Sequence, residues 1–64
     1  MHITGKTLKK VRGDLGESQT TFAERFGVDQ ATVSRWETEG PPDRGVAAKL
    51  IARVLDDLAV EARA

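Results

Sequence analysis

The segment SQTTFAERFGVDQATVSRWE, residues 18–37, carries the strongest structural signal in this sequence. It predicts two short helices, over residues 19–26 and about 30–38, joined by a sharp turn. Ser18 and Asp29 are suited to N-cap positions, because a short side-chain oxygen can accept a hydrogen bond from the free N–H groups of the first helical turn. Gly27 lies where a left-handed residue is needed to end the first helix.

The same stretch has one apolar side and one polar side. Its apolar residues recur at helical spacing and are expected on the inner side of both helices. We therefore interpret Phe22 and Phe26 as core residues, since their spacing does not suit base-stacking platforms, and Trp36 as a core residue beside Val33. The outer side of the second helix remains polar.

Several constrained positions in this stretch resemble the helix-turn-helix of the Cro/repressor-type (xenobiotic-response-element) DNA-binding family. The matching residues are Gln19, Ala23, Gly27, Val33, Trp36 and Glu37. With the preceding helix, the resemblance covers roughly residues 4–55. It implies an all-α, four-helix, lambda-repressor-like domain whose third helix reads DNA. The alternative is a generic helical hairpin with glycine in its turn.

Double-stranded DNA is the partner that this resemblance implies. Rotating by 100° per residue places a polar ridge opposite Val33. Gln30 can pair bidentately with adenine and Arg35 with guanine, although Arg35 could instead contact only a phosphate. The candidate base-reading residues are Gln30, Ala31, Thr32, Ser34 and Arg35.

Other polar residues are candidates for contacts to the DNA backbone or for bracing the reading helix. The resemblance implies that Gln19 contacts a phosphate and braces Gln30. The full set of phosphate-binding candidates is Gln19, Thr20, Thr38 and Arg44. The resemblance also implies a structural ion pair between Arg12 and Glu37, the alternative being two exposed charges of little energetic consequence.

A first helix over residues 5–15 and a long fourth helix over about 44–61 complete the prediction. In the first, Gly13 should cost on the order of 1 kcal/mol relative to alanine. Glu17 stands where the family usually has an apolar residue, which predicts weaker apolar packing at the corner between the first two helices.

The fourth helix carries more apolar surface than one core needs. Its apolar positions cover an arc of about 180° at 100° per residue, whereas a helix packed on one core needs somewhat over about 100°. We therefore predict a two-fold homodimer on a palindromic site, with reading helices about 34 Å apart. The alternative is that the extra surface covers the small core. The predicted dimer interface consists of Ile51, Leu55, Leu58 and Ala62.

Composition limits the other possibilities. The 64 residues predict one domain, residues 1–64, and the absence of cysteine excludes a disulfide framework or a thiolate metal site. The ten basic residues balance ten acidic ones, with +2 over residues 1–36 and −2 over residues 37–64. A neutral total favours a well-fitted DNA site over sequence-blind phosphate binding.

The sequence therefore predicts a cytoplasmic transcriptional regulator, most simply a repressor or autoregulator of its own operon. The start MHITGKTLKK has no apolar segment typical of a signal peptide. We expect no metal, no cofactor and no enzymatic activity, because no nucleophile–base pair or phosphate-binding glycine loop is present. Regulators of this build are familiar from bacteria, phages and mobile elements. Two alternatives stay open: an antitoxin that also binds a toxin, and a protein-interaction module on the same fold.

Overall fold

The computed structural model describes the backbone of residues 3–63 and the side chains of residues 3–59. The chain forms four helices: α1 (Gly5–Leu15), α2 (Gln19–Phe26), α3 (Gln30–Glu39) and α4 (Gly45–Arg63). The predicted all-α, four-helix fold is confirmed, and each predicted helix end lies within two residues of the observed one. Among the described residues, no helix combines the length and the hydropathy required to cross a membrane.

The first three helices begin and end at residues whose chemistry specifies the boundary. Thr4, Ser18 and Asp29 are the N-caps of α1, α2 and α3, and each side chain accepts a hydrogen bond from the backbone N–H three residues later. Gly16 and Gly27 end α1 and α2 in the left-handed conformation, both with φ of 69°. These boundaries keep the connections between the first three helices short.

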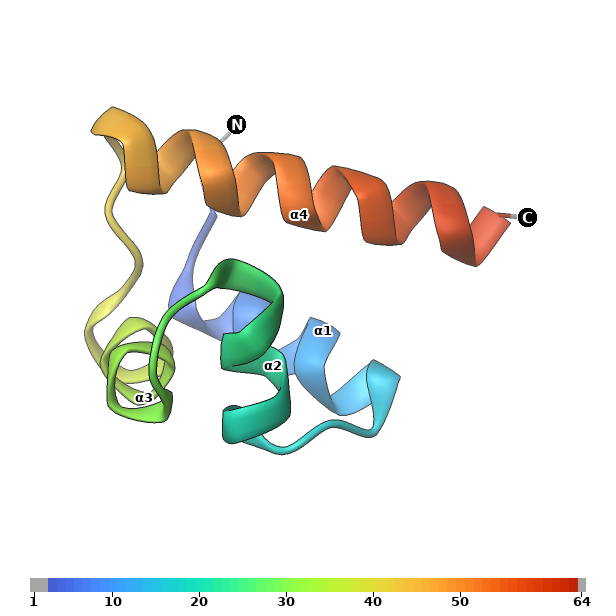
Figure 1. Ribbon diagram of the computed structural model, residues 1–64, viewed down its shortest axis with the longest axis horizontal. Helices are drawn as coiled ribbons and strands as arrows, with labels where there is room; N and C mark the ends of the chain where they lie inside the picture. Colours follow the sequence, from blue (N-terminus) through green and yellow to red (C-terminus); the bar gives the residue numbers. More distant parts are fainter. Residues whose placement is uncertain (1–2, 64) are drawn as a thin grey trace.

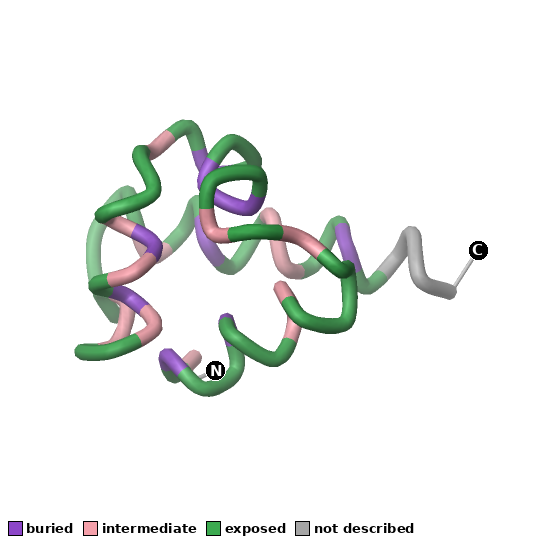
Figure 2. The backbone as a smooth tube through the Cα atoms, turned by 90° about the horizontal axis from the view of Figure 1, so that it is seen from below, coloured by how far each residue is buried: buried purple, intermediate pink, exposed green. Residues whose placement is uncertain are grey.

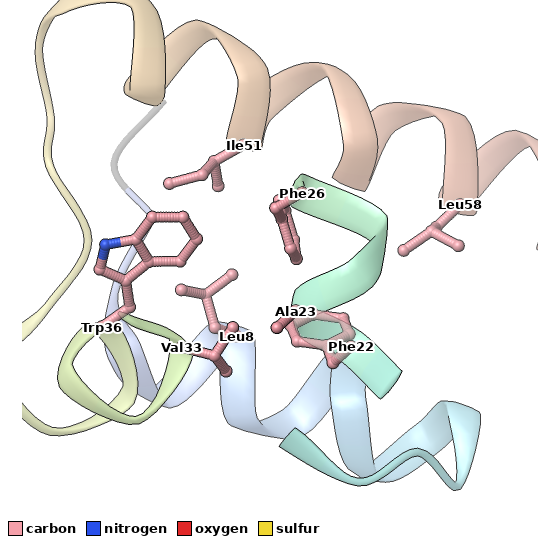
Figure 3. Close-up of a cluster of buried hydrophobic side chains, with 8 residues drawn as sticks. All are labelled: Leu8, Phe22, Ala23, Phe26, Val33, Trp36, Ile51 and Leu58. Atoms are coloured by element: carbon pink, nitrogen blue, oxygen red, sulfur yellow. The ribbon is translucent and has the colours of Figure 1, made fainter. Parts of the chain in front are cut away.

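The hydrophobic core lies where α4 crosses the unit formed by α1, α2 and α3 (Figure 1). The Phe26 ring packs edge-on against Phe22, with 5.0 Å between ring centroids, and against Trp36, at 5.6 Å. Figure 3 shows the buried side chains of all four helices converging in this region: Leu8, Phe22, Ala23, Phe26, Val33, Trp36, Ile51 and Leu58. The predicted core positions of Phe22, Phe26 and Trp36 are confirmed.

Gly5 allows an unusually close approach between α1 and α3. A Cβ atom at this position would lie 2.5 Å from the backbone oxygen of Glu37 and 2.6 Å from that of Trp36. Both obstacles are backbone atoms, so no side-chain rotation could relieve the overlap. The start of α1 can therefore approach the end of α3 only because residue 5 lacks a side chain.

The burial pattern of α4 corrects the predicted dimer interface. Ile51 is 1% exposed and Leu58 is 9% exposed within a single chain, so both belong to the core and neither is available to a partner. For these two residues the alternative interpretation holds, because α4 uses them to cover the helices beneath it. Leu55 is partly buried against the same core, and the side chain of Ala62 lies outside the described residues. Val46, an apolar residue in the first turn of α4, is 85% exposed.

Candidate nucleic-acid interface

Helix α3 has one buried face and one exposed face. Val33 and Trp36 lie in the core, whereas Gln30, Ala31 and Arg35 are exposed. Figure 2 shows the same pattern along the chain, where short buried segments interrupt a largely exposed backbone. The buried side fixes the helix to the domain, so the opposite side can present polar groups in a constant position.

Two threonines of α3 already use their hydroxyl groups in hydrogen bonds within the helix or to its cap. The Thr32 hydroxyl donates to Asp29 Oδ1 at 2.6 Å, and the Thr38 hydroxyl donates to the Ser34 carbonyl at 2.9 Å. The hydrogen bond from the Thr32 side chain is the main cause of the lowered pKa of Asp29. Thr32 and Ser34 are half-buried. Of the five predicted base-reading residues, Gln30, Ala31 and Arg35 are therefore the more accessible.

The predicted ion pair between Arg12 and Glu37 is present and joins α1 to α3. Arg12 Nε donates to Glu37 Oε2 at 2.6 Å, and Arg12 Nη2 donates to Oε1 at 3.1 Å. The side chains are 19% and 5% exposed, respectively. The hydrogen bonds from Arg12 are the largest cause of a lowered pKa of Glu37, and the same contact raises the pKa of Arg12. Glu37 is therefore held as a carboxylate.

Gln19 connects this ion pair to the start of α3. Its Nε2 donates to Glu37 Oε1 at 3.0 Å, and its Oε1 accepts a hydrogen bond from Gln30 Nε2. We refer to Arg12, Gln19, Gln30 and Glu37 as the Glu37 network. It joins α1, α2 and α3 by side chains alone. The contact predicted between Gln19 and Gln30 is part of it.

The comparison with known protein families identifies this arrangement of helices. A family model described as the RsaL-like HTH domain matches residues 9–48, which is more than half of the chain. The chain belongs to this helix-turn-helix family. Searches of curated proteins and of solved structures each found no match. The match supports the role of a DNA-binding regulator, and the narrower Cro/repressor relationship remains a resemblance.

In the RsaL-like domain, the predicted phosphate-binding residues differ in what they can offer a ligand. Thr20, Thr38 and Arg44 are exposed, and Arg44 directly precedes α4. Gln19 is half-buried, with both ends of its amide engaged in the Glu37 network. Its remaining N–H and the free backbone N–H groups at the start of α2 are the donors left for an anion.

Sequence reasoning missed a second ion pair in the RsaL-like domain. Arg25 donates to Glu17 through Nε at 2.9 and 3.1 Å and through Nη2 at 2.6 Å. The hydrogen bonds from Arg25 are the main cause of a lowered pKa of Glu17. Where weak apolar packing was expected, a salt bridge therefore connects the α1–α2 connection to the end of α2. The two residues are eight apart and only Arg25 lies in a helix, so no helical periodicity could have paired them.

The candidate interface of the RsaL-like domain consists mainly of side chains that can donate or accept hydrogen bonds. Among the described residues, no group of three or more His, Cys, Asp or Glu side chains is placed to hold a metal ion. The chemistry that these residues can perform is recognition, because amide, hydroxyl and guanidinium groups match the donors and acceptors on base edges and phosphates.

Proposed function

We propose that this chain binds double-stranded DNA sequence-specifically and acts as a homodimeric transcriptional regulator, most simply a repressor of its own operon. The observation that carries the proposal is the division of α3 into an anchored inner face, with Val33 and Trp36, and an exposed polar face that begins at Gln30. An α-helix fits the major groove of B-DNA, where each base pair presents a distinct pattern of donors and acceptors. The Cro/repressor-type resemblance suggests the same orientation on DNA.

Within this proposal, base reading and phosphate binding belong to different residues. Gln30 and Arg35 present the groups suited to adenine and guanine, and Ala31 can meet a thymine methyl group. Arg44 and the start of α2 would contact the DNA backbone. Since the chain carries no net charge, specific contacts must supply a large part of the binding free energy.

Selection of bound fragments from random duplex DNA, followed by affinity measurements over a range of salt concentrations, tests the proposal. Gln30→Ala should relax base preference at one position and weaken binding to the preferred site by about 1–3 kcal/mol. Arg44→Ala should weaken binding to all sequences similarly and reduce the salt slope by about 1. Lys49→Ala removes the same charge from α4 and is the matched control. A folded chain that binds no duplex even at low salt would contradict the proposal and favour a protein-interaction module.

A homodimer would use the groove between α1 and α4, in place of the buried residues predicted from the sequence. This groove has a volume of about 710 Å³, and its lining includes Ile3, Val11 and Leu55. A second chain of this protein is the proposed occupant of the groove, because a two-fold dimer would place two reading helices on successive turns of one face of DNA.

The dimer has its own test. Ala59 is exposed and lines the groove, so Ala59→Arg should abolish dimerisation in sedimentation equilibrium. Ala47→Arg introduces the same side chain at an exposed position of α4 outside this groove and should leave the dimer intact. A monomer at all concentrations would exclude this mode of assembly. Stable association with a different protein, such as a toxin, would support the antitoxin alternative.

A further inference from the structure

We propose that the Glu37 carboxylate, two turns along α3 from Gln30, fixes the orientation of the Gln30 amide and thereby acts as a positioning residue for base selection. The inference rests on the proposed DNA-binding function and extends it to a residue that would itself touch no base. It follows from the direction of the hydrogen bonds in the Glu37 network.

The first step is the position of the carboxylate. The Glu37 side chain is 5% exposed and receives two hydrogen bonds from Arg12. These contacts hold both of its oxygens in place beside α2. A carboxylate fixed at this point determines which end of a neighbouring amide can form a hydrogen bond with it.

The second step is the inventory of donors and acceptors. An ionised carboxylate can only accept, so Gln19 must turn its Nε2 toward Glu37, at 3.0 Å. The oxygen of the Gln19 amide then faces Gln30. Since this oxygen can also only accept, Gln30 must turn its own Nε2 toward Gln19. The orientations of both amides are therefore determined by one charge.

The third step is what remains free on Gln30. One N–H is occupied by Gln19, which leaves the second N–H and the Oε1 atom of an exposed side chain. An amide N–H and an amide oxygen on one side chain are the donor and acceptor that pair with N7 and N6 of adenine. If the Gln30 side-chain amide were flipped by 180°, its oxygen would face Gln19. The order of donor and acceptor that it presents to the major groove would then be reversed. Glu37 therefore selects one of two possible reading patterns.

Glu37→Gln tests this inference because it keeps the size of the side chain and removes the fixed direction. An amide at position 37 can donate or accept, so both orders of the network become possible. Base preference is measured on four duplexes that differ at the position identified by Gln30→Ala. The wild-type chain should prefer adenine by about 5-fold to 150-fold, as expected for one bidentate pair. Glu37→Gln should reduce this preference several-fold.

A purely structural role for Glu37 gives a different result. It would weaken binding to all four duplexes by the same factor and leave the ratios of the four affinities unchanged. That outcome would overturn the inference. In the Gln30→Ala background, Glu37→Gln should change all four affinities equally, because the side chain through which it acts is gone. Glu17→Gln is the matched control: it makes the same chemical change in the ion pair with Arg25 and should preserve the base preference.

Leaving Arg12 without its partner could prevent folding of Glu37→Gln. The double variant Arg12→Met, Glu37→Gln removes both charges and avoids the unpaired cation. It should show the same loss of adenine preference. Unchanged preference in a folded double variant would overturn the inference.

A measurement without DNA separates this inference from the proposed function. The side-chain amide signals of Gln30 in ¹H–¹⁵N spectra should shift in Glu37→Gln and not in Glu17→Gln. Gln19→Leu should abolish that response, because the intermediate amide is removed. If the Gln30 amide signals do not shift in Glu37→Gln, the inference is overturned whether or not the chain binds DNA. A response of Gln30 in a chain that binds no duplex would support the positioning and reject the DNA-binding function.

Discussion

The unit formed by α1, α2 and α3 and the covering helix α4 are held in place by different kinds of contact. The first three helices are joined by the ion pair between Arg12 and Glu37 and by the amides of Gln19 and Gln30, in addition to apolar packing. A second ion pair, between Arg25 and Glu17, holds the α1–α2 connection against α2. Helix α4 contributes Ile51 and Leu58 to the core. Apolar contacts are non-directional, whereas hydrogen bonds fix orientation. The comparison indicates that the geometry of the exposed face of α3 is set within α1–α3, and that α4 mainly supplies buried area.

Large-to-small substitutions in the two regions should have the largest effects. Phe22→Ala should lower the free energy of unfolding by about 3–5 kcal/mol, and Ile51→Ala by about 2–5 kcal/mol, since both side chains are fully buried. Urea unfolding followed by circular dichroism gives both values.

Val46→Ala is the control for this pair, because Val46 is 85% exposed and its truncation should change the free energy of unfolding by less than about 0.5 kcal/mol. Both core variants should unfold in a single transition. Release of α4 in Ile51→Ala, with α1–α3 still folded, would show that the two regions are separate cooperative units.

Two glycines of α1 should respond in opposite directions to the same substitution. Gly5→Ala should lower the free energy of unfolding by about 1–3 kcal/mol, because the new methyl group would overlap backbone atoms of α3. Gly13→Ala should raise it by about 0.5–1 kcal/mol, since a Cβ there meets no atom within 4 Å and alanine favours helix. Thermal unfolding of both variants measures the difference. Equal effects would mean that the close approach of α1 to α3 is unimportant.

Acid should act on the α1–α3 unit through Glu37 and Glu17. The pKa of each is lowered in the folded chain by hydrogen bonds from its arginine partner. Their contribution is therefore complete above the unfolded value of about 4.3 and is lost as pH falls through the lower folded pKa. The free energy of unfolding should decrease in this range by less than in the core substitutions. Urea titrations at a series of pH values measure it.

Two variants sharpen the acid experiment. Glu37→Gln should flatten the decrease below about pH 4.3, because one of the carboxyl groups with a lowered pKa is removed. Ile51→Ala adds and removes no titratable group, so it should lower the free energy of unfolding by a similar amount at each pH. If the free energy of unfolding of Glu37→Gln decreases at low pH as much as that of the wild-type chain, the ion pair with Arg12 contributes little to this decrease.

Sequence reasoning succeeded where the signal is local. The caps at Ser18 and Asp29 and the glycine at position 27 act within one helical turn, so they define α2 and α3 without knowledge of the rest of the fold. The inward position of Phe22 and Trp36 follows from helical periodicity in the same way. The Arg12–Glu37 pair came from family resemblance, since the two residues lie 25 positions apart.

Features that depend on how helices cross could not be predicted. The approach of Gly5 to the backbone of α3 and the pairing of Glu17 with Arg25 require the tertiary arrangement. The assignment of Ile51 and Leu58 to a dimer failed for the same reason, because an apolar arc does not reveal how much of it one chain can cover. The polar outer face of α3 could be predicted, and its actual contacts with DNA remain proposals.

Trp36 is the single tryptophan of the chain, and it is buried between α3 and the rest of the core. An indole in this position gives the domain an intrinsic fluorophore that senses loss of packing as a red shift of its emission. Because the polar ridge lies on the opposite side of the same helix, a bound duplex should leave that emission nearly unchanged. Fluorescence can therefore report denaturation of the domain independently of what it binds.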